Sequence, residues 1–326
     1  MEKYLEVENL RTYFNTPEGV VKSVDGVSFH INKGETLALV GESGCGKTVT
    51  SLSLIRLLAD TADLQYDRLV IDGEEIKELS KEEARMIRGK KISMIFQEPM
   101  TSLNPVYRIE KQIGEVFELH NPGISKQEIH EKSVEIMKKV GIPNPEERLK
   151  VYPHQLSGGL RQRAMIAISL ASNPKMLIAD EPTTALDVTI QAQIIDLLKQ
   201  LQRDSDMSIL LITHDFGVVS QIASRVAVMY AGKIVEEGML EDIFKDPWHP
   251  YTKLLIMSIP GIKVTRGGRL ESISGTVPNP LNFPKGCRFA PRCPYALDKC
   301  FDTPPEETVV GNRRVSCHLR REEHEQ

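Results

Sequence analysis

The sequence lacks a long hydrophobic run, because no segment reaches the roughly 18 apolar residues that a membrane-spanning helix needs. The first ten residues, MEKYLEVENL, lack the basic and then apolar pattern of a signal peptide. There is also no excess of basic residues, and the net charge of −4 gives no general reason to expect a nucleic-acid partner. These absences predict a cytoplasmic chain, and they leave open its docking onto a membrane protein.

Cysteine is scarce and unevenly placed. Of the five cysteines, Cys45 stands alone in a Gly-rich loop, and the other four crowd the C-terminal part of the chain. Those four are Cys287, Cys293, Cys300 and Cys317, spaced C-x5-C-x6-C-x16-C. In a reducing compartment, four clustered cysteines are more often a metal site than two disulfides.

The order of apolar segments predicts a parallel α/β core with an inserted helical subdomain. Apolar strands are expected at ETLALV, KMLIAD and SILLITH, and helices at VTSLSLIRLL and IQAQIIDLLKQLQR. The first of these helices would present Leu54, Leu57 and Leu58 on one face. Earlier strands are expected at YLEVENL and GVSFHI, helical patterns fill residues from about 100 to 165, and VAVMYAGKIVEEG predicts a hairpin that turns at Ala231–Gly232.

Beyond residue 240 the composition shifts to Pro, Cys and Arg. The segment GTVPNPLNFPKGCRFAPRC has too few apolar residues for a core of its own, so a covalent or metal staple would explain its order. The chain of 326 residues is therefore divided into a domain at 1–240 and an extension at 241–326.

The segment GESGCGKT runs from Gly41 to Thr48, between a predicted strand and a predicted helix. Backbone N–H groups of such a loop converge on phosphate oxygens, and the helix adds the positive end of its dipole. Lys47 is expected between the β- and γ-phosphates, and Thr48 is expected to bind Mg²⁺. The residues expected around the phosphates are Gly41, Ser43, Gly44, Cys45, Gly46, Lys47, Thr48 and Val49. A chance glycine loop is the alternative, and the flanking strand and helix argue against it.

Three further segments place polar residues just after apolar strands, where open α/β sheets bind ligands. In KMLIADEP the apolar strand leads to Asp180 and Glu181, and we expect Asp180 to hold Mg²⁺ and Glu181 to act as general base. In MIFQEP the apolar strand leads to Gln97, which is expected to orient water or contact Mg²⁺. His214 in LLITHD is expected to donate to a γ-phosphate. The alternatives are a helix cap for the carboxylates and a structural hydrogen bond for the histidine.

The Gly-rich loop, Gln97, LSGG, Asp180–Glu181, Asp187 in TTALD and His214 follow one another in a single order. This order closely resembles the ATP-binding-cassette (ABC) ATPases over roughly residues 1–240. The resemblance implies an α/β fold with a RecA-like mixed sheet, an antiparallel β subdomain, an inserted helical subdomain and a small Cys-rich extension. It also implies ATP hydrolysis with Mg²⁺.

In that family the LSGG segment closes over the γ-phosphate held by a partner's phosphate loop, so that ATP lies between two subunits. The residues implied to contact the partner's ATP are Leu156, Ser157, Gly158, Gly159, Gln162 and Asp187. An ordinary serine N-cap followed by glycines is the alternative. The family also places an aromatic residue against adenine, and the matching position here is Phe14, with Tyr13 as the alternative. Cys45 is expected to be a small spacer that points away from phosphate.

The segments FQEPMTSLNP, HPYTKLLIMSIP and GCRFAPRCPYA are similar to those of ATPase subunits of dipeptide and oligopeptide importers, some of which bind an iron–sulfur cluster. The four thiolates suffice for [4Fe–4S] or Zn²⁺, and the lack of short C-x2–4-C pairs favours iron–sulfur. Arg288, Arg292 and His318 are expected to offset cluster charge, and His318 is an alternative ligand. Four unligated thiols remain possible.

The importer resemblance implies a position on the cytoplasmic face of the membrane, beside two membrane-spanning permease subunits and, indirectly, an external solute-binding protein. It also implies a second ABC ATPase, with a heterodimer favoured over a homodimer. One alternative is an importer for another solute such as nickel. Another is a soluble ABC ATPase acting on nucleic acid or ribosomes, but those proteins commonly carry two cassettes or a long coiled coil.

Overall fold

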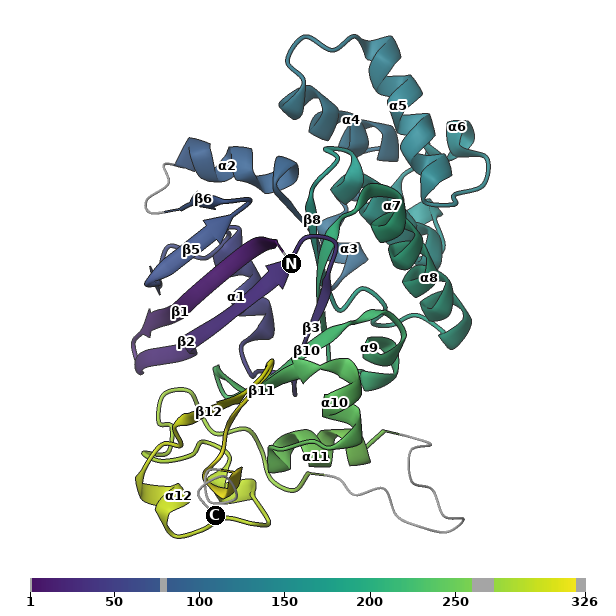
Figure 1. Cartoon of the computed structure of the whole chain (residues 1–326). Coiled ribbons are helices and arrows are strands. Elements are labelled where there is room, and N and C mark those ends of the chain that lie inside the picture. Colours follow the sequence, from purple (N-terminus) through teal and green to yellow (C-terminus); the bar gives the residue numbers. More distant parts are fainter. Residues whose placement is uncertain (1, 77–80, 260–272, 321–326) are drawn as a thin grey trace. The chain divides into compact units, whose positions relative to one another are not determined.

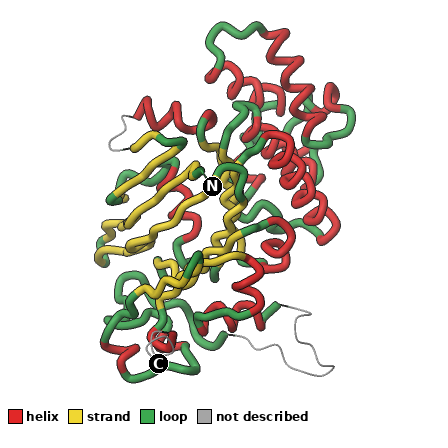
Figure 2. The backbone as a smooth tube through the Cα atoms, viewed as in Figure 1, coloured by secondary structure: helices red, strands yellow, loops and turns green. Residues whose placement is uncertain are grey.

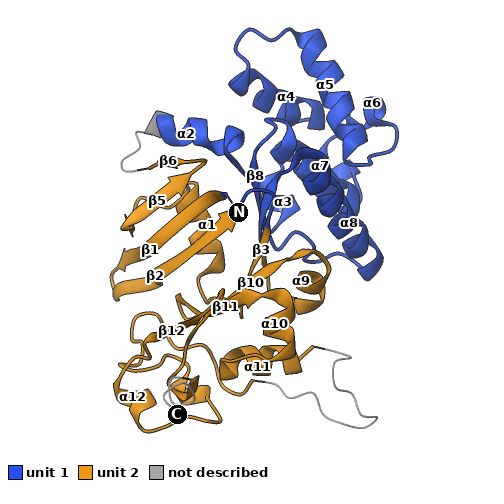
Figure 3. Cartoon of the chain, viewed as in Figure 1, with its two compact units in different colours: residues 1–2, 32–35, 78–210 blue, residues 3–31, 36–77, 211–326 orange. Residues whose placement is uncertain are grey.

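The computed structural model describes residues 2–76, 81–259 and 273–320. The chain divides into two compact units, which Figure 3 colours separately. Unit 1 comprises residues 1–2, 32–35 and 78–210, and unit 2 comprises residues 3–31, 36–77 and 211–326. The C-terminal extension lies within unit 2, so it does not form a compact unit of its own.

Unit 2 contains an antiparallel sheet with the strand order β2-β1-β5-β6, and β4 pairs with the other end of β1 (Figure 1). Its strands are β1 (Lys3–Thr16), β2 (Gly19–Asn32), β4 (Ala62–Gln65), β5 (Arg68–Ile71) and β6 (Glu74–Glu75). Along β1, Leu10 and Thr12 are buried while Arg11 between them is half-buried. This alternation covers one face of the sheet, and it confirms the strands predicted at YLEVENL and GVSFHI.

Unit 2 also contains β3 (Thr36–Val40), which pairs in parallel with β10 (Arg225–Tyr230), and every residue of both strands is buried. The strand β10 forms a hairpin with β11 (Lys233–Met239). The turn residues Ala231 and Gly232 have φ values of 44° and 83°, as a tight hairpin turn requires, so the predicted hairpin is confirmed. The extension adds two strands to this edge, because β13 (Arg313–Ser316) pairs with β11 and β12 (Glu307–Val310) pairs with β13.

The first helix of unit 2, α1 (Lys47–Leu54), is shorter than predicted. Arg56 has a φ of 51°, a left-handed value that cannot continue a helix, and Leu57 is 44% exposed. The expected apolar face of Leu54, Leu57 and Leu58 is therefore wrong. The other helices are α9 (Phe216–Ile222), α10 (Leu240–Lys245), α11 (Pro250–Met257), α12 (Lys299–Asp302) and the 3-10 turn η2 (Ala290–Arg292).

Unit 1 is built around two parallel strands, β7 (Ile92–Ile95) and β8 (Met176–Asp180), and most of the remainder is helical (Figure 2). The helices are α2 (Lys81–Lys90), α3 (Pro99–Ser102), α4 (Ile109–His120), α5 (Lys126–Lys139), α6 (Pro145–Arg148), α7 (Gly158–Leu170) and α8 (Val188–Ser205), with a 3-10 turn η1 (Pro153–Gln155). The strand β9 (Ser208–Thr213) contributes to both units. Across the described ranges, no helix has the length and apolar character required to cross a membrane.

The extension shares the hydrophobic core of unit 2. Tyr230 of β10, Tyr251 of α11 and Phe289 are each at most 1% exposed, and the Tyr230 ring centroid lies 4.6 Å from that of Tyr251 and 5.2 Å from that of Phe289. The extension thus lacks an independent core, as predicted, but packing on β10 and strand pairing with β11 already account for its order. A metal staple is not needed to explain that order.

Candidate functional site

The phosphate loop joins β3 to α1 within unit 2. Gly41 and Gly46 have φ values of 156° and 106°, and a Cβ atom there would lie 2.2 Å from the Met229 oxygen or 2.3 Å from the Ser23 oxygen. No larger residue fits either position without displacing backbone. The tight packing of these two glycines therefore sets the course of the loop between strand and helix.

Lys47 is 5% exposed, and its ammonium donates to the carbonyls of Gly41 at 2.7 Å and Glu42 at 3.0 Å. Ser43, Gly44 and Thr48 are exposed on the same loop, and Val49 is half-buried. Helix α1 begins at Lys47 without a side-chain N-cap, so its positive end is not screened by a capping group. The loop therefore has the shape and donors expected of an anion-binding segment.

Cys45 lies in this loop with its side chain turned inward. It is 1% exposed, and burial raises the pKa of its thiol, so the group stays protonated. The Cys45 side chain thus points into the protein, and its role as a spacer beside phosphate stays a prediction.

The two candidate adenine-stacking residues lie side by side on β1 and differ in their surroundings. The Tyr13 hydroxyl donates to Asp25, and the ammonium of Lys22 lies 5.7 Å from the Tyr13 ring centroid. Burial and the Asp25 carboxylate raise the pKa of Tyr13 to about 12. Phe14 is partly exposed and pairs with Ala62 of β4. Tyr13 is thus bound into a polar network, which favours Phe14 as the stacking residue.

Asp180 ends β8 in unit 1, and Glu181 follows it directly. Asp180 is 1% exposed, while Glu181 is half-buried and adopts a φ of 45° that turns the chain sharply away from the strand. The Glu181 Oε2 atom accepts from the Thr184 hydroxyl at 2.7 Å and from Nε2 of Gln97 at 3.3 Å.

The meeting of Gln97 and Glu181 follows from the strand register. Because β7 and β8 are parallel with Ile95 opposite Ala179, two residues further along each strand bring Gln97 level with Glu181. The sequence predicts each of them at the end of a strand, and the structure places them in contact.

His214 lies in unit 2, directly after β9, and is exposed. The next residue, Asp215, caps α9 by accepting from the backbone N–H groups of Gly217 at 2.7 Å and Val218 at 3.3 Å. The imidazole therefore lies on a short, well-braced turn at the end of a buried strand, where a γ-phosphate donor is expected.

The LSGG segment begins α7 in unit 1. Ser157 caps the helix by accepting from Leu160 N–H at 3.4 Å, and Ser157 and Gly158 are exposed, with Gly159 half-buried. Leu156 and Gln162, by contrast, are only 3% and 2% exposed. Their side chains pack within unit 1, and contacts of these two residues with a partner's ATP stay a prediction. Within the LSGG segment, the exposed residues are Ser157 and Gly158.

Asp187 is exposed and caps α8 by accepting from Ile190 N–H at 3.0 Å. This is an ordinary N-cap, and it accounts for an acidic residue at this position without any ligand. A contact with a partner's nucleotide stays a prediction.

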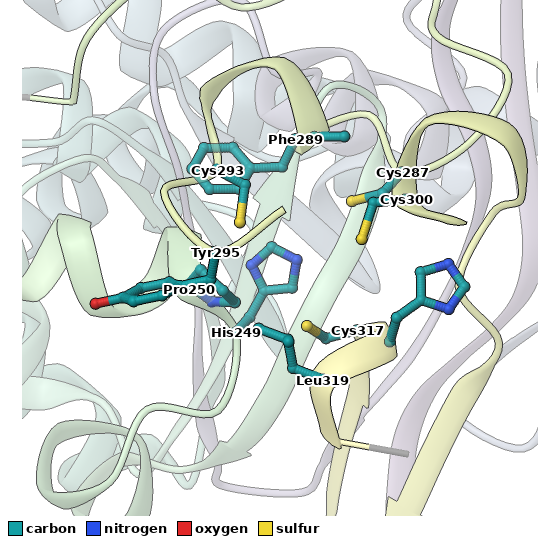
Figure 4. A pocket seen from close by; sticks show the side chains of 11 residues that line it. His249, Pro250, Cys287, Phe289, Cys293, Tyr295, Cys300, Cys317 and Leu319 are labelled. Carbon is teal, nitrogen blue, oxygen red and sulfur yellow. The ribbon is translucent and has the colours of Figure 1, made fainter. Parts of the chain in front are cut away.

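The four C-terminal cysteines line one pocket in unit 2, together with His249, Pro250, Phe289, Tyr295 and three flanking residues (Figure 4). Figure 4 shows the sulfur atoms of Cys287, Cys293, Cys300 and Cys317 directed into this pocket around the His249 ring. Burial raises the pKa of Cys287 and Cys293, and it raises that of Cys317 to about 11. All five cysteines of the chain are free thiols, which excludes a disulfide framework in this structure.

Within residues 2–76, 81–259 and 273–320, no three His, Cys, Asp or Glu side chains converge closely enough to hold a metal ion. The two arginines expected to offset cluster charge bind carboxylates instead: Arg288 pairs with Asp25, and Arg292 pairs with Glu42. His318 does line the pocket, and its Nε2 lies 2.9 Å from the Thr303 carbonyl oxygen. Both arginines are therefore neutralised by carboxylates, and their role as charge partners of a cluster stays a prediction.

Sequence reasoning missed three residues beside the phosphate loop and the pocket. Glu42 in the loop, Tyr251 in α11 and the fully buried His249 had no assigned role, although HPYTKLLIMSIP was singled out as a segment. The His249 Nδ1 accepts from Tyr251 N–H at 3.0 Å, and burial lowers the pKa of His249 to about 3. A buried histidine followed by a helix-starting Pro250 was the signal available in the sequence.

Comparison with known proteins adds to this geometry. The model of the ABC transporter family matches residues 24–184, and that of the oligopeptide/dipeptide transporter C-terminal region matches residues 235–300. The chain is 51% identical over 99% of its length to the oligopeptide transport ATP-binding protein AppD of Bacillus subtilis, covering 98% of that protein. It is 50% identical to the dipeptide transport ATP-binding protein DppD of the same organism, with 98% of this chain and 96% of that protein covered.

Among solved structures, the ATP-binding cassette MJ0796, in a dimeric post-hydrolysis state bound to ADP and Pi, aligns with a TM-score of 0.65 and 27% identity. The alignment covers 72% of this chain and 98% of that one, so nearly the whole of that cassette has a counterpart here. The phosphate loop, the Gln97–Glu181 contact and the exposed start of α7 are thus found in a chain that belongs to the ABC transporter ATPases, in the group with the oligopeptide/dipeptide transporter C-terminal region.

Proposed function

We propose that this chain powers the import of di- and oligopeptides through a membrane ABC transporter. The observation that carries the proposal is the identity of about 50%, spread over nearly the whole chain, to proteins named for oligopeptide and dipeptide transport. The match to the C-terminal region typical of such transporters supports it independently of the cassette. Nickel or another solute would require the same ATPase chemistry, so the solute is what must be tested.

We propose that the exposed face of the phosphate loop binds the triphosphate, with Lys47 as the cation and backbone N–H groups of the loop as donors. Phe14 stacks on adenine in this proposal. Thr48, Gln97 and Asp180 offer oxygen ligands of the kind that Mg²⁺ prefers, and the bound ion would neutralise charge on the transferred phosphate.

Glu181 is proposed as the general base that takes a proton from the attacking water. The two hydrogen bonds to its Oε2, from Thr184 and Gln97, support this role because they hold the carboxylate in one orientation. His214 is proposed to donate to the γ-phosphate from the turn after β9.

The turn of Ser157, Gly158 and Gly159 is proposed to contact ATP held by a second ATPase subunit. Its exposure and the dimeric state named for the related cassette MJ0796 support this arrangement. The γ-phosphate would then satisfy donors on two chains, and its hydrolysis would release them. We propose that the second subunit is a related ATPase, and that the pair docks on two permease subunits at the cytoplasmic face, with an external solute-binding protein supplying the peptide.

We also propose that the cysteine pocket holds a [4Fe–4S] cluster. Four thiols on one pocket supply the full ligand set of such a cluster, while the lack of side chains converging on a single ion among the described residues argues against zinc. A bound cluster would join distant parts of the extension covalently through its iron atoms. Iron and acid-labile sulfide in anaerobically purified protein would support the proposal, and loss of iron from Cys293→Ser but not Cys45→Ser would localise it.

Uptake of a labelled dipeptide and of labelled nickel by cells that do and do not produce this chain tests the solute. Peptide uptake that depends on the chain supports the proposal, and nickel uptake alone overturns its solute class. Co-purification with two membrane-spanning subunits distinguishes an importer of either solute from a soluble ATPase that acts on nucleic acid.

A further inference from the structure

Glu42 is an acidic residue inside a loop that binds anions. It follows Gly41 directly, and Lys47 donates to its carbonyl oxygen, so Glu42 is part of the loop that is proposed to bind the triphosphate. An unneutralised carboxylate in this loop would repel ATP, because like charges near a protein surface repel each other. The side chain of Glu42 is 30% exposed, so solvent screens it only in part.

Arg292 from the C-terminal extension neutralises this carboxylate. Its two terminal nitrogens donate to the two Glu42 oxygens at 2.7 and 2.9 Å, a paired geometry that fixes direction as well as charge. The Arg292 side chain is 5% exposed, and Glu42 raises the pKa of its guanidinium. Further bonds to the Ser274 carbonyl at 2.9 Å and the Tyr230 hydroxyl at 3.2 Å hold the guanidinium in place.

Tyr251 holds the backbone of the same residue. Its hydroxyl accepts from the Glu42 N–H at 2.8 Å, and its ring is fully buried against Tyr230 and Phe289. Burial raises the pKa of Tyr251, so the hydroxyl remains protonated at any physiological pH. Two residues outside the phosphate loop, Arg292 and Tyr251, thus bind Glu42 through its side chain and its main chain.

Both contacts start beside the cysteine pocket. Arg292 precedes Cys293, and Tyr251 lies two residues after His249, whose ring also lines the pocket. We infer that Arg292 and Tyr251 are positioning residues for nucleotide binding: they hold Glu42 and cancel its charge, and they link the phosphate loop to the cysteine pocket. This inference rests on the proposed role of the loop in binding ATP.

The charge part is tested by equilibrium binding of a fluorescent ATP analogue to the purified full-length chain. Arg292→Ala is expected to weaken binding about tenfold, since it leaves Glu42 unopposed beside the triphosphate. Adding Glu42→Gln to Arg292→Ala is expected to restore the affinity to within about twofold of wild type, because the repelling charge is then gone. Arg314→Ala is the matched control, since it removes an arginine that joins the extension to Glu237 of β11 rather than to the loop.

Glu42→Gln alone keeps Arg292 and is expected to bind the analogue at least as tightly as wild type. Wild-type affinity of Arg292→Ala for the analogue would overturn the inference. So would a double variant that binds the analogue no more tightly than Arg292→Ala, or a Glu42→Gln variant that binds it more weakly than wild type. Should Arg292→Ala fail to fold, as judged by circular dichroism, Glu42→Gln still decides between the outcomes. Lys47→Ala tests the loop itself: wild-type binding by that variant would remove the proposed function, whatever the Arg292 series shows.

The link to the pocket is tested by hydrogen exchange of the backbone segment 287–300 in wild type with and without ATP. Coupling is reciprocal, so ATP is expected to slow exchange in this segment about threefold in wild type. The effect is expected to disappear in the Arg292→Ala, Glu42→Gln double variant, which still binds ATP but has lost the contact. Exchange that ATP leaves unchanged in wild type, or slows equally in the double variant, would overturn the link.

Discussion

Two glycine-rich turns begin helices in this molecule, and they differ in what holds them. The phosphate loop before α1 is braced from several sides: two glycines pack against backbone, Lys47 bonds two loop carbonyls, and the extension binds Glu42. The turn before α7 is capped by its own Ser157 and is exposed to solvent. One turn is held rigidly within its unit, and the other is presented outward.

The comparison shows how helix N-termini with the same donor groups can suit two different binding arrangements. A helix N-terminus attracts phosphate in both places, because the dipole and the first N–H groups are the same. A braced loop suits a nucleotide held by its own chain, while an exposed, self-capped turn is suited to a ligand brought by another chain. The experiments below change one turn at a time, or the chemistry that both are proposed to serve.

The largest effect is expected from Glu181→Gln, which should lower the rate of ATP hydrolysis about 1,000-fold by removing the general base. The amide still accepts from Thr184, so the local structure is kept. Phosphate release measures the rate, and size-exclusion chromatography with ATP should show a dimer that wild type forms only transiently. Glu135→Gln on the exposed face of α5 is the control, and a normal rate in Glu181→Gln would refute the base assignment.

Lys47→Ala breaks the first turn. We expect ATP affinity to fall about 100-fold, since the variant loses both a charge-assisted phosphate contact and the bonds that close the loop. Binding of a fluorescent nucleotide measures the loss. Lys138→Ala, an exposed lysine of α5, should bind as wild type does, and equal affinities for the two variants would contradict the assignment.

His249 lies in the segment that supports the first turn, and it predicts a pH dependence. Its pKa is about 3 in the folded chain and about 6.5 when unfolded, so below pH 6.5 only the unfolded chain takes up the proton. The free energy of unfolding should therefore fall by about 2 kcal/mol between pH 7 and pH 5, and His249 should contribute no dependence above pH 7.

The control for this effect is His249→Asn, which can still cap α11 but does not titrate. Urea unfolding at a series of pH values should show a smaller loss on acidification in His249→Asn than in wild type. Parallel curves for the two proteins would mean that burial of His249 does not set the dependence.

The smallest effect concerns the second turn. Ser157→Ala should lower stability by about 1 kcal/mol through loss of the N-cap, as should Ser125→Ala, which removes the capping box of α5. Only Ser157→Ala should also slow ATP hydrolysis by the assembled dimer, by about tenfold, because only that turn is proposed to reach nucleotide. If the two variants hydrolyse ATP equally, the proposed sandwich fails.

Local chemistry was largely predictable. The phosphate loop and the hairpin turn at Ala231–Gly232 follow from short segments whose period and end groups are specific. The contact between Gln97 and Glu181 was not predicted, because it depends on the parallel pairing of β7 with β8. The helix after the loop was predicted too long, because a left-handed Arg56 ends it where the apolar pattern continues. The burial of Leu156 and Gln162 was not predicted, since a motif does not tell which of its side chains are buried.

What the sequence alone determined is the kind of chemistry: glycines, one lysine and strand-end carboxylates at set spacings can do little else than bind and hydrolyse a triphosphate. Only the tertiary structure decided that Arg292, 250 positions from Glu42, cancels its charge, and that the extension shares the core of unit 2. Such pairings depend on which segments the fold brings together. Contacts between residues far apart in the sequence produce no periodic pattern from which they could be predicted.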